Sequence, residues 1–594
     1  MTGRRPIRVS GKARGGMFPK PSSGRAGILL IFSFLFGGIV FLRLYMLQVL
    51  GEEGYKRLAD NQHQVSSDIA PDRGEVYFRE GDATYPAAVN REYPMLYLSP
   101  REITDVAAVA SAVSSAVSVP VEEIRSKCAD RNDPFEIIKK KLSDDEVGRI
   151  KSLTLPGIHL LPEKYRFYPG SGLAAQVIGF VSTDDQTRAE KGKYGIEASL
   201  DEELRGKPGH VIQSRDAAGR WISTEDREVV PAVPGADVVL TIDQVIQNET
   251  ERILSQAMEK HQATGGSVIV MEPSTGKILA MASSPSFDSN AYASVDDYSR
   301  FMNPTVSQSY EPGSVMKPLT MAVGIEEGKV NPDTEYVDTG SVTLSGYTIH
   351  NAEDKVYGKS TMTKVLDNSI NTGVIFVEKL VGNERFRKYM EDFGFGERSG
   401  IELPAELPGS IGNLSDTRQD LEFYTASFGQ GVTTTPLQMV TAYAALANGG
   451  TLMRPQIIDR YIRDDGTEEE TLPSKVRQVV SPDTARQIGD MLESVVLIGH
   501  GKQANVPGYR VGGKTGTAQV AKAGGGGYEE GLSIGTFVGY APLDNPKFVV
   551  LAKIDNPKDV VWAESSAAPM FGDVMKFLLS YAKIEPTKPI PEKK

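Results

Sequence analysis

Residues 267–282, with the sequence SVIVMEPSTGKILAMA, indicate how the main fold of this chain begins. Two apolar runs, Ser267–Met271 and Lys277–Ala282, flank the segment Pro273-Ser274-Thr275-Gly276. Short runs rich in Val, Ile and Leu are typical of buried strands, and the intervening segment has the composition of a turn. The stretch therefore predicts a β-hairpin.

The sequence downstream of the hairpin is helical first and strand-like later. Helical patterns dominate to about residue 450. Strand-like runs return at Arg510–Gly512, Ser533–Tyr540 and Phe548–Ile554, and an apolar helix is expected at Ala567–Tyr581. Strands at both ends of a helical middle predict an α+β domain in which one sheet collects both ends of the segment.

A domain boundary is predicted upstream of the hairpin, where Pro231 and Pro234-Gly235 interrupt every periodic pattern. Beyond it, Val238–Thr241 predicts a strand. Asp243 follows as a cap for a long amphipathic helix at Gln244–His261.

The region between Glu52 and about Arg227 mixes short strand-like and helical pieces. Helices are expected there at Ile103–Val117 and at Pro134–Leu153.

An uncharged segment near the N-terminus predicts a membrane-spanning helix. Ala26–Leu42 has no charged residue, and apolar character resumes after Arg43 as far as Leu50. The uncharged run is at the short end for a span, but Arg43 can extend the span by reaching toward the lipid headgroups. A cleaved signal peptide is the alternative. The run exceeds the usual apolar region of such peptides, however, and no Ala-x-Ala-like cleavage site follows it.

The segment before this helix is strongly basic and contains no acidic residue. Its basic residues are Arg4, Arg5, Arg8, Lys12, Arg14, Lys20 and Arg25. The positive-inside rule therefore predicts that the first 25 residues lie in the cytoplasm and that the chain after Gly51 lies outside it, with a single pass. The chain as a whole carries a net charge of −12, so the remainder is acidic, which argues against nucleic acid as a partner.

Metal and disulfide chemistry are not expected. Cys128 is the only cysteine, so the chain can form neither an intramolecular disulfide nor a thiolate metal cluster. The six histidines are scattered without the spacing of metal ligands, at His63, His159, His210, His261, His350 and His500. We predict no metal and no cofactor.

The segment Glu311-Pro312-Gly313-Ser314-Val315-Met316-Lys317 carries an S-x-x-K motif at an expected helix start. Residues three apart share one face of a helix, so the amine can reach the hydroxyl. A serine needs an adjacent base to become a nucleophile, and a lysine is such a base only when its pKa is lowered. A second S-x-x-K, Ser274–Lys277, lies in the hairpin turn and is discarded, because a turn does not bring the lysine over the serine.

Two further motifs follow along the chain. Ser369-Ile370-Asn371 precedes an apolar helical run, and on its own a Ser and an Asn at this place read as a helix cap. Lys514-Thr515-Gly516-Thr517 follows Gly512-Gly513, and glycines inside a strand indicate the close approach of another backbone or a ligand.

The third motif has a competing interpretation, because Gly508–Thr515 also fits the phosphate-loop pattern G-x-x-x-x-G-K-[ST]. That loop requires a buried strand before it and a helix after it. Here a polar stretch precedes the motif, whereas a strand-like stretch and the run Gly524–Gly527 follow it. We therefore disfavour nucleotide binding and interpret Gly524–Gly527 as a flexible loop.

The order S-x-x-K, S-x-N, K-T-G is more specific than any one motif. With these residues the chain resembles the class B penicillin-binding proteins, which are monofunctional peptidoglycan D,D-transpeptidases. Further matches to the family are Tyr310–Ser314, Ala426–Gly431, Thr434–Gln438, Arg166–Pro169, Gly195–Glu197 and Leu204–Gly209. The family usually shows an Asp-Arg-Asn-Gly-like sequence at the end of the stretch that corresponds to Arg73–Gly81, and this chain differs from it there.

The resemblance implies acyl transfer through a serine. Lys317 would take the proton of Ser314, which would attack the penultimate D-alanine carbonyl of a stem pentapeptide. Ser369 would relay a proton to the departing D-alanine, and Asn371 would hold the substrate peptide and orient Lys317. An amine of a neighbouring stem would then resolve the acyl-enzyme, whereas β-lactams would stay bound.

The resemblance also implies which residues bind the donor. Lys514, with the hydroxyls of Thr515 and Thr517, would meet the terminal carboxylate, and the backbone N–H groups of Ser314 and Thr517 would form the oxyanion hole. The implied catalytic residues are Ser314, Lys317, Ser369, Asn371 and Lys514. The implied substrate-binding residues are Thr515, Gly516 and Thr517.

The expected organisation follows from the same comparison. It comprises a cytoplasmic arm (1–25), a transmembrane helix (26–50), an α+β pedestal of the dimerisation type (51–232), a catalytic domain of the penicillin-binding serine transpeptidase fold (238–582) and a disordered tail (583–594). The expected partners are peptidoglycan stem peptides, the cytoplasmic membrane and, as a family implication, a polytopic glycosyltransferase.

Two other functions compete with the transpeptidase. A β-lactam-hydrolysing or β-lactam-sensing protein could have the same fold, but a hydrolase would not need the pedestal, and a sensor normally carries several spans and a metalloprotease motif. A catalytically silent scaffold is the third hypothesis, which the complete set of motif residues disfavours.

Overall fold

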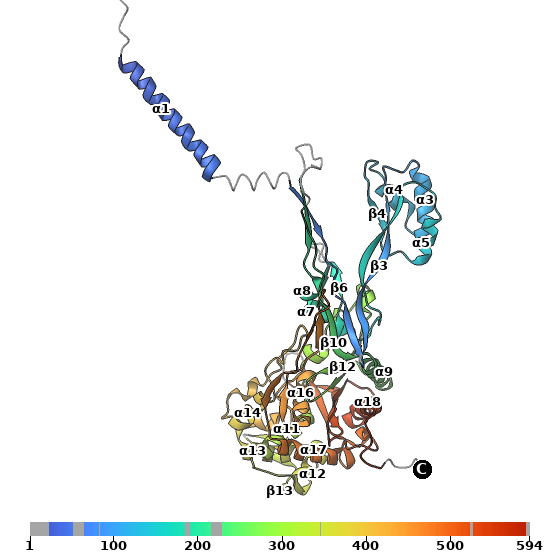
Figure 1. Ribbon diagram of the computed structural model, residues 1–594. Helices are drawn as coiled ribbons and strands as arrows, with labels where there is room; N and C mark the ends of the chain where they lie inside the picture. Colours follow the sequence, from blue (N-terminus) through green and yellow to red (C-terminus); the bar gives the residue numbers. More distant parts are fainter. Residues whose placement is uncertain are drawn as a thin grey trace, which may run out of the picture. The chain divides into compact units, whose positions relative to one another are not determined.

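The computed structural model describes residues 23–50, 64–81, 83–183, 190–214, 228–344, 346–522 and 527–589 (Figure 1). Most of the predicted basic arm, the end of the predicted tail and Gly524–Gly526 lie outside these ranges. The chain divides into two compact units. The anchor unit comprises Met1–Ala70 with Pro208–Ala232, and the main unit comprises Pro71–Lys207 with Val233–Lys594.

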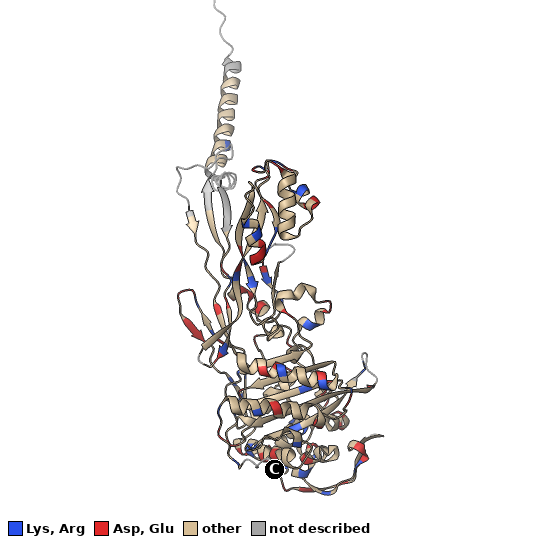
Figure 2. Cartoon of the chain, turned by 90° about the vertical axis from the view of Figure 1, so that its right-hand side faces the viewer, with Lys and Arg blue, Asp and Glu red and all other residues tan. Residues whose placement is uncertain are grey.

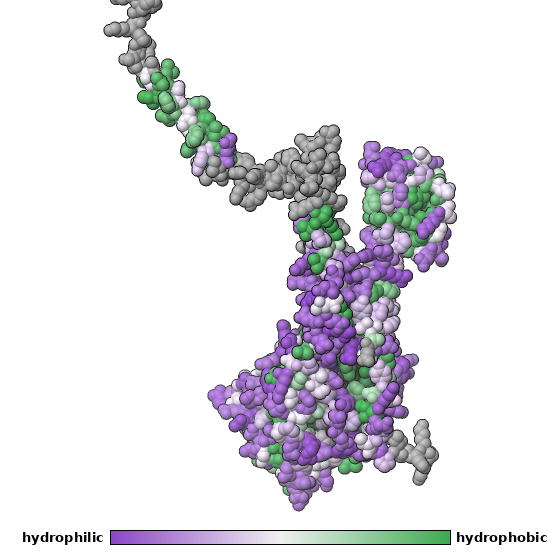
Figure 3. Space-filling view, viewed as in Figure 1, coloured by the Kyte–Doolittle hydropathy of each residue, from purple (hydrophilic) through white to green (hydrophobic). Residues whose placement is uncertain are grey.

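The anchor unit contains the predicted apolar helix. Its elements are α1 (Ser23–Tyr45), the π-helical turn η1 (Met46–Leu50) and a three-stranded antiparallel sheet in the order β1 (Gln64–Ile69), β8 (Gly209–Ser214), β9 (Glu228–Val230). Within the described residues, Gly27–Gln48 is the helical stretch long and apolar enough to cross a membrane. Its large apolar side chains are exposed, and Phe32, Phe34 and Phe41 are each more than 70% exposed. In Figure 3 most of α1 is green, the colour of hydrophobic residues. Such a surface requires an apolar surrounding.

The N-terminal part of the main unit builds a small subdomain with its own core. Its elements are β2 (Val76–Glu80), β3 (Ala83–Leu98), α3 (Val106–Val117), α4 (Val121–Lys127), β4 (Glu136–Lys139), α5 (Asp144–Lys151) and β5 (Ile158–Phe167). Helix α3 confirms the first predicted helix, and apolar side chains of α3, α4, β3 and β4 pack together.

The prediction of one helix over Pro134–Leu153 is wrong in its first half. Glu136–Lys139 is strand β4, which pairs with β3, and α5 begins only at Asp144. Ser143 accepts a hydrogen bond from the Glu146 N–H, and the Glu146 side chain returns to the Ser143 N–H, a capping box that fixes this start. The adjacent β-branched residues Ile137 and Ile138 suit a paired strand better than a helix.

A buried ionic network follows in the main unit. The short elements here are α6 (Ala175–Ile178), β6 (Val181–Thr183), β7 (Glu190–Gly192), α7 (Gly195–Ser199) and α8 (Asp201–Arg205). The carboxylate of Glu197, which is fully buried, accepts from Arg73 Nε at 2.8 Å and from Arg166 Nε at 2.6 Å. Arg73 Nη1 also donates to Asp201 at 2.8 Å. The network joins the stretches Arg73–Gly81, Arg166–Pro169 and Gly195–Glu197, which lie far apart in the sequence.

One sheet combines strands from both sides of the predicted domain boundary. Its order is β19 (Glu468–Glu470), β18 (Ile458–Ile462), β10 (Asp237–Asp243), β2, β3, β4, and β5 also pairs with β3. Strand β10 lies parallel to β2 and antiparallel to β18. The regions before and after the boundary therefore share backbone hydrogen bonds.

The second sheet confirms the predicted α+β architecture. Five antiparallel strands run in the order β12 (Ile278–Ser284), β11 (Gly265–Met271), β23 (Phe548–Asp555), β22 (Tyr528–Ala541), β21 (Gly512–Ala521). The predicted hairpin, β11 and β12, thus lies beside β23 from the C-terminal part of the chain, as expected.

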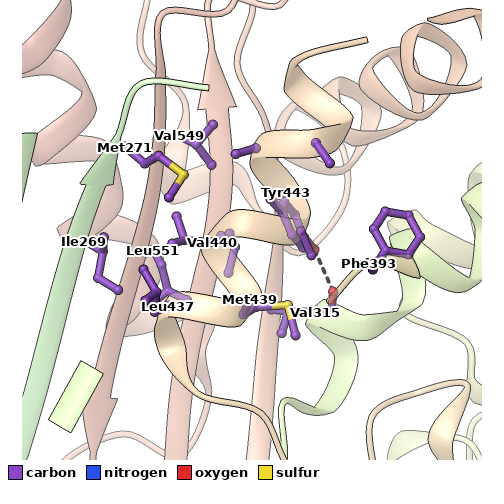
Figure 4. Close-up of a cluster of buried hydrophobic side chains, with 14 of the residues drawn as sticks. Ile269, Met271, Val315, Phe393, Leu437, Met439, Val440, Tyr443, Val549 and Leu551 are labelled. Carbon is purple, nitrogen blue, oxygen red and sulfur yellow. Dashed lines mark hydrogen bonds between the residues drawn. The ribbon is translucent and has the colours of Figure 1, made fainter. Parts of the chain in front are cut away.

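Helices cover both faces of this sheet, which explains the continuous apolar run of β11. Val268 and Val270 face α9 (Gln244–His261) and α18 (Ala567–Tyr581), in one buried cluster. Ile269 and Met271 face α16 (Pro436–Ala447), whose Leu437 and Val440 pack on them, together with β23 residues (Figure 4). Both predicted helices are present, and Asp243 caps α9 by accepting from the N–H groups of Val245 and Ile246.

The remaining elements lie mostly between β12 and β21. The helices are α10 (Pro304–Ser307), α11 (Lys317–Glu326), α12 (Met362–Asp367), α13 (Asn371–Val381), α14 (Asn383–Asp392), α15 (Asp420–Ala426) and α17 (Pro482–Leu497). The 3-10 turns of this region include η4 (Gly313–Met316), η5 (Ala352–Asp354) and η8 (Ala563–Ser565). Small two-stranded sheets pair β13 (Glu335–Asp338) with β16 (Gly358–Thr361), β14 (Ser341–Leu344) with β15 (Tyr347–His350), and β17 (Thr451–Met453) with β20 (Lys475–Gln478). Basic and acidic residues are interspersed in the view of Figure 2.

Candidate active site

Ser314 lies in the turn η4, directly before α11. Gly313 has a φ of +59°, a conformation that L side chains rarely adopt, and its N–H donates to the Gly429 carbonyl at 3.0 Å. Below the turn, the buried Tyr443 hydroxyl donates to the Val315 carbonyl at 2.8 Å (Figure 4). Ser314 itself stays partly exposed. The turn is thus fixed on both sides while its serine remains accessible.

Lys317, the first residue of α11, is fully buried. Its Nζ donates to Ser369 Oγ at 3.1 Å and also to the Ser369 carbonyl. Burial, and secondarily the charge of Lys514, hold the pKa of Lys317 well below its usual value. The amine is therefore predisposed to be neutral and to accept a proton.

Ser369 and Asn371 lie where α12 ends and α13 begins. Ser369 has a φ of +54°, an uncommon conformation that turns the chain between the two helices. The alternative interpretation of this motif as a helix cap is wrong, because the N-cap of α13 is Ile370 and no side chain caps the helix. Ser369 instead contacts Lys317, and the Asn371 amide donates to the His350 carbonyl at 2.8 Å.

The K-T-G motif lies in β21, the last strand in the order of the five-stranded sheet. A Cβ atom on Gly516 would lie 2.8 Å from the Pro312 carbonyl oxygen and 3.1 Å from the Val315 nitrogen. Glycine at this position therefore allows the strand to lie against η4. Because the motif lies within a paired strand that continues to Ala521, it has no phosphate-loop geometry.

Lys514 is fully buried, and its Nζ donates to the Thr515 carbonyl at 3.2 Å and to Thr515 Oγ1 at 3.4 Å. Burial lowers the pKa of Lys514 to about 7, although the carboxylates of Asp367 and Glu564 act in the opposite direction. A second amine of low pKa thus lies near the first.

One pocket of about 370 Å³ brings the three motifs together. Its lining includes Ser314 from the first motif, Ser369 and Asn371 from the second, and Thr515 and Thr517 from the third. Lys317 reaches the pocket through Ser369, and Lys514 lies behind Thr515.

The segment Ala426–Gln438 supports this pocket. Besides the Gly429 contact, the Gly431 N–H donates to Glu311 Oε1 at 2.9 Å. Thr434 and Tyr310 exchange two backbone hydrogen bonds of 2.9 Å. The similarity of this segment to the family thus has a structural reason, because the segment holds the backbone that leads to Ser314.

Several pocket residues were not predicted from the sequence. They are Glu353, Lys355, Tyr357, Phe428, Gln430, His500, Trp562 and Glu564. Phe428 and Gln430 lie in the stretch Ala426–Gly431 that resembles the family, whereas no short pattern marks the other six. His500 is one of the six histidines that lack the spacing of metal ligands. The discarded S-x-x-K lies in the turn between β11 and β12, where Lys277 Nζ pairs with Asp459 at 2.6 Å.

Comparison with known proteins agrees with this geometry. The family model described as "Penicillin binding protein transpeptidase domain" matches residues 266–576, and the one described as "Penicillin-binding Protein dimerisation domain" matches residues 68–240.

Curated relatives are similar over nearly the whole length. Stage V sporulation protein D of Bacillus subtilis is 35% identical over 95% of this chain and 87% of the relative. Peptidoglycan D,D-transpeptidase FtsI of Escherichia coli is 30% identical, over 94% of this chain and 91% of the relative.

A solved structure gives the same assignment. Penicillin-binding protein 3 of Mycobacterium tuberculosis, complexed with aztreonam, superposes with a TM-score of 0.67 at 29% identity, covering 88% of this chain and 99% of that chain. The chain therefore belongs to the penicillin-binding protein family, with a transpeptidase domain that follows a dimerisation domain.

Proposed function

We propose that the chain is a membrane-anchored peptidoglycan D,D-transpeptidase that forms an acyl-enzyme through Ser314. The observation that carries the proposal is the fully buried amine of Lys317, which is hydrogen-bonded to Ser369 in the wall of the pocket that Ser314 lines and whose pKa is lowered by burial. Relatives named as peptidoglycan D,D-transpeptidases support the reaction class.

In the proposed reaction, Lys317 removes the proton of Ser314 as the hydroxyl oxygen attacks the penultimate D-alanine carbonyl. Backbone N–H groups of Ser314 and Thr517 stabilise the oxyanion. The proton then passes by way of Ser369 to the leaving D-alanine, and an amine from a neighbouring stem displaces Ser314.

Donor binding is proposed along β21. Because this strand ends the order of the sheet, a peptide in extended conformation can pair with its free side. Thr515 and Thr517 line the pocket, and Lys514 supplies positive charge behind them for the terminal carboxylate. Asn371, which lines the pocket and whose amide donates to the His350 carbonyl, is proposed to hold the donor backbone.

The cellular arrangement is also a proposal. We propose a cytoplasmic arm (1–25), a membrane helix (26–50), a pedestal (51–232), an extracytoplasmic catalytic domain (238–582) and a tail (583–594). The apolar helix supports the anchoring, and the basic residues before it support the orientation. A polytopic glycosyltransferase remains the proposed partner in the membrane.

Intact-mass analysis of the full-length chain in detergent, after incubation with benzylpenicillin, tests the proposal. The wild type is expected to gain one whole penicillin, retained for many minutes, whereas Ser314→Ala gains none. Ser274→Ala is the matched control, because it alters the discarded S-x-x-K and is expected to label fully.

Labelling of Ser314→Ala, or absence of labelling in the wild type, would contradict the proposal. Rapid loss of the adduct with release of opened penicillin would favour the β-lactam-hydrolysing alternative.

A further inference from the structure

A histidine–glutamate pair lies in the wall of the same pocket. Nδ1 of His500 is 3.1 Å from Oε2 of Glu564, and both residues line the pocket together with Ser314. The two side chains are 44% and 39% exposed, so a ligand in the pocket can reach them. No step of the proposed reaction described above uses either residue.

The pair connects the two sides of the pocket. On one side, the His500 N–H donates to the Asp367 carbonyl at 3.3 Å, two residues before Ser369. A Cβ atom on Gly499 would lie 2.6 Å from the same oxygen, so glycine allows this close packing. On the other side, the N–H of Ala563, next to Glu564, donates to Thr517 Oγ1 at 3.1 Å.

The charges around the pair favour a cation. The other charged residues that line the pocket are Glu353 and Lys355, which form an ion pair of 2.6 Å with each other. Glu564 is thus an accessible carboxylate whose contact in the pocket wall is an imidazole. Lys514 also lies close enough for its amine to be attracted by Glu564. The amines of Lys317 and Lys514 are buried and hydrogen-bonded to Ser369 and Thr515, however, whereas the Glu564 carboxylate stays accessible from the pocket.

We propose that His500 and Glu564 form the subsite that receives the acceptor, a primary ammonium group on a neighbouring stem. This inference rests on the proposed function and names the residues that bind its second substrate. The Glu564 carboxylate attracts the ammonium. Because His500 Nδ1 faces that carboxylate and donates to it, Nε2 is left with the free lone pair that accepts a proton.

The proton balance of acyl transfer explains why such a base is useful. An ordinary lysine-like amine has a pKa of about 10.4, so it arrives protonated at pH 7 and must lose a proton before it can attack. One proton passes from the ammonium to Nε2 of His500, and the imidazolium returns it to water. As the nitrogen bonds to the acyl carbon and the bond to the Ser314 oxygen breaks, the second proton passes through Ser369 and Lys317 to that oxygen. The products are the amide, the free Ser314 hydroxyl and one released proton.

The partition of the acyl-enzyme between an amine and water tests the inference. The full-length chain in detergent is supplied at pH 7 with an activated thioester donor carrying a D-alanyl group. The acceptor is either D-alanine, whose amine is protonated, or hydroxylamine, which is uncharged at this pH. The ratio of aminolysis to hydrolysis is measured by mass spectrometry for the wild type, His500→Gln and Glu564→Gln.

Both variants are expected to lower the ratio for D-alanine about a hundred-fold, the lower end of the usual contribution of a general base, and to affect the ratio for hydroxylamine far less. His159→Gln is the matched control, because His159 forms a similarly exposed pair with Glu102 at 2.8 Å in the N-terminal subdomain. It is expected to behave as the wild type.

Two outcomes would overturn the inference. One is an unchanged ratio in both variants, and the other is an equal fall for both acceptors, which would indicate that the pair only maintains the shape of the pocket. If benzylpenicillin did not label the wild type, that result would contradict the proposed function itself and therefore also this inference.

Discussion

At the scale of single residues, the environment of Lys317 decides what the site can do. A lysine in water is protonated at neutral pH and cannot act as a base. Complete burial of this amine beside a second buried lysine disfavours the charged form, and Ser369 gives the neutral amine a hydrogen-bonding partner.

The pH dependence of penicillin acylation should report this lowered pKa. Because in the proposed reaction only neutral Lys317 accepts the proton of Ser314, the acylation rate is expected to rise with pH and to reach its plateau well below pH 10. Lys514→Gln removes a positive charge that lowers the pKa of Lys317, so the rising limb should move to higher pH. The measurement is the rate of acylation, normalised to the plateau of each variant, between pH 5 and pH 10.

Lys355→Gln provides the control for this experiment. Lys355 also lines the pocket, but its side chain is 55% exposed and its charge is screened by solvent. The rising part of the pH–rate curve of Lys355→Gln should therefore lie at the same pH as that of the wild type. A limb that moves to lower pH in Lys514→Gln would contradict the assignment.

The residue scale also marks what sequence reasoning could and could not find. Ser314, Lys317, Ser369 and Lys514 could be proposed from the sequence because each belongs to a short pattern and the patterns occur in order. His500 and Glu564 belong to no pattern, since 64 residues separate them and their contact exists only after η8 and the segment following α17 have folded. The pair can therefore be recognised from the three-dimensional structure but not from a spacing rule.

At the scale of elements, the contact between β21 and the turn η4 forms the site. The strand can lie this close only because position 516 lacks a side chain. Thr517, which follows directly, then lines the pocket together with Ser314.

Gly516→Ala is expected to reduce penicillin acylation at least about ten-fold, because the added methyl displaces the turn that positions Ser314. The same methyl in a packed contact is expected to cost about 1–3 kcal/mol of folding stability. The methyl would meet the backbone of Pro312 and Val315, which cannot rotate away as a flexible side chain could. Acylation rate and thermal unfolding are to be measured together.

Gly148→Ala is the companion variant for this comparison. A Cβ atom on Gly148, within helix α5, meets nothing within 4 Å, so acylation should be unchanged and stability equal or slightly higher. Wild-type acylation by Gly516→Ala would show that the close approach is not needed.

Element prediction succeeded where local pattern and final packing agree. The hairpin, the helix at Ala567–Tyr581 and the helix capped by Asp243 follow from periodicity and end signals. The segment Pro134–Leu153 failed because β4 is defined by its pairing with β3, a partner about 40 residues away that a local window does not contain.

At the scale of the whole molecule, the main unit is held by features that join distant parts of the sequence. The network around Glu197 ties Arg73 to Arg166 and Asp201, and the sheet that contains β2 and β10 crosses the predicted domain boundary. The fold class could be predicted from the sequence, but this sharing could not, because parallel pairing of β2 with β10 leaves no local signature.

Glu197→Gln is expected to lower the stability of the main unit by about 3–5 kcal/mol, because it leaves Arg73 and Arg166 buried without their shared counter-charge. Thermal unfolding followed by circular dichroism measures the effect. Asp72→Asn serves as the control, since Asp72 pairs with Lys164 at 2.6 Å in an exposed position and should leave the midpoint unchanged. An unaltered midpoint in Glu197→Gln would argue against a structural role for the network.

The mixed sheet has a practical consequence for preparing the protein. A recombinant fragment that started after residue 236 would lack β2 and would leave the backbone groups along that side of β10 without their strand partner. An open apolar strand edge invites pairing with a second molecule and precipitation. Any shortened soluble form should therefore retain Arg73–Glu80 together with the catalytic region.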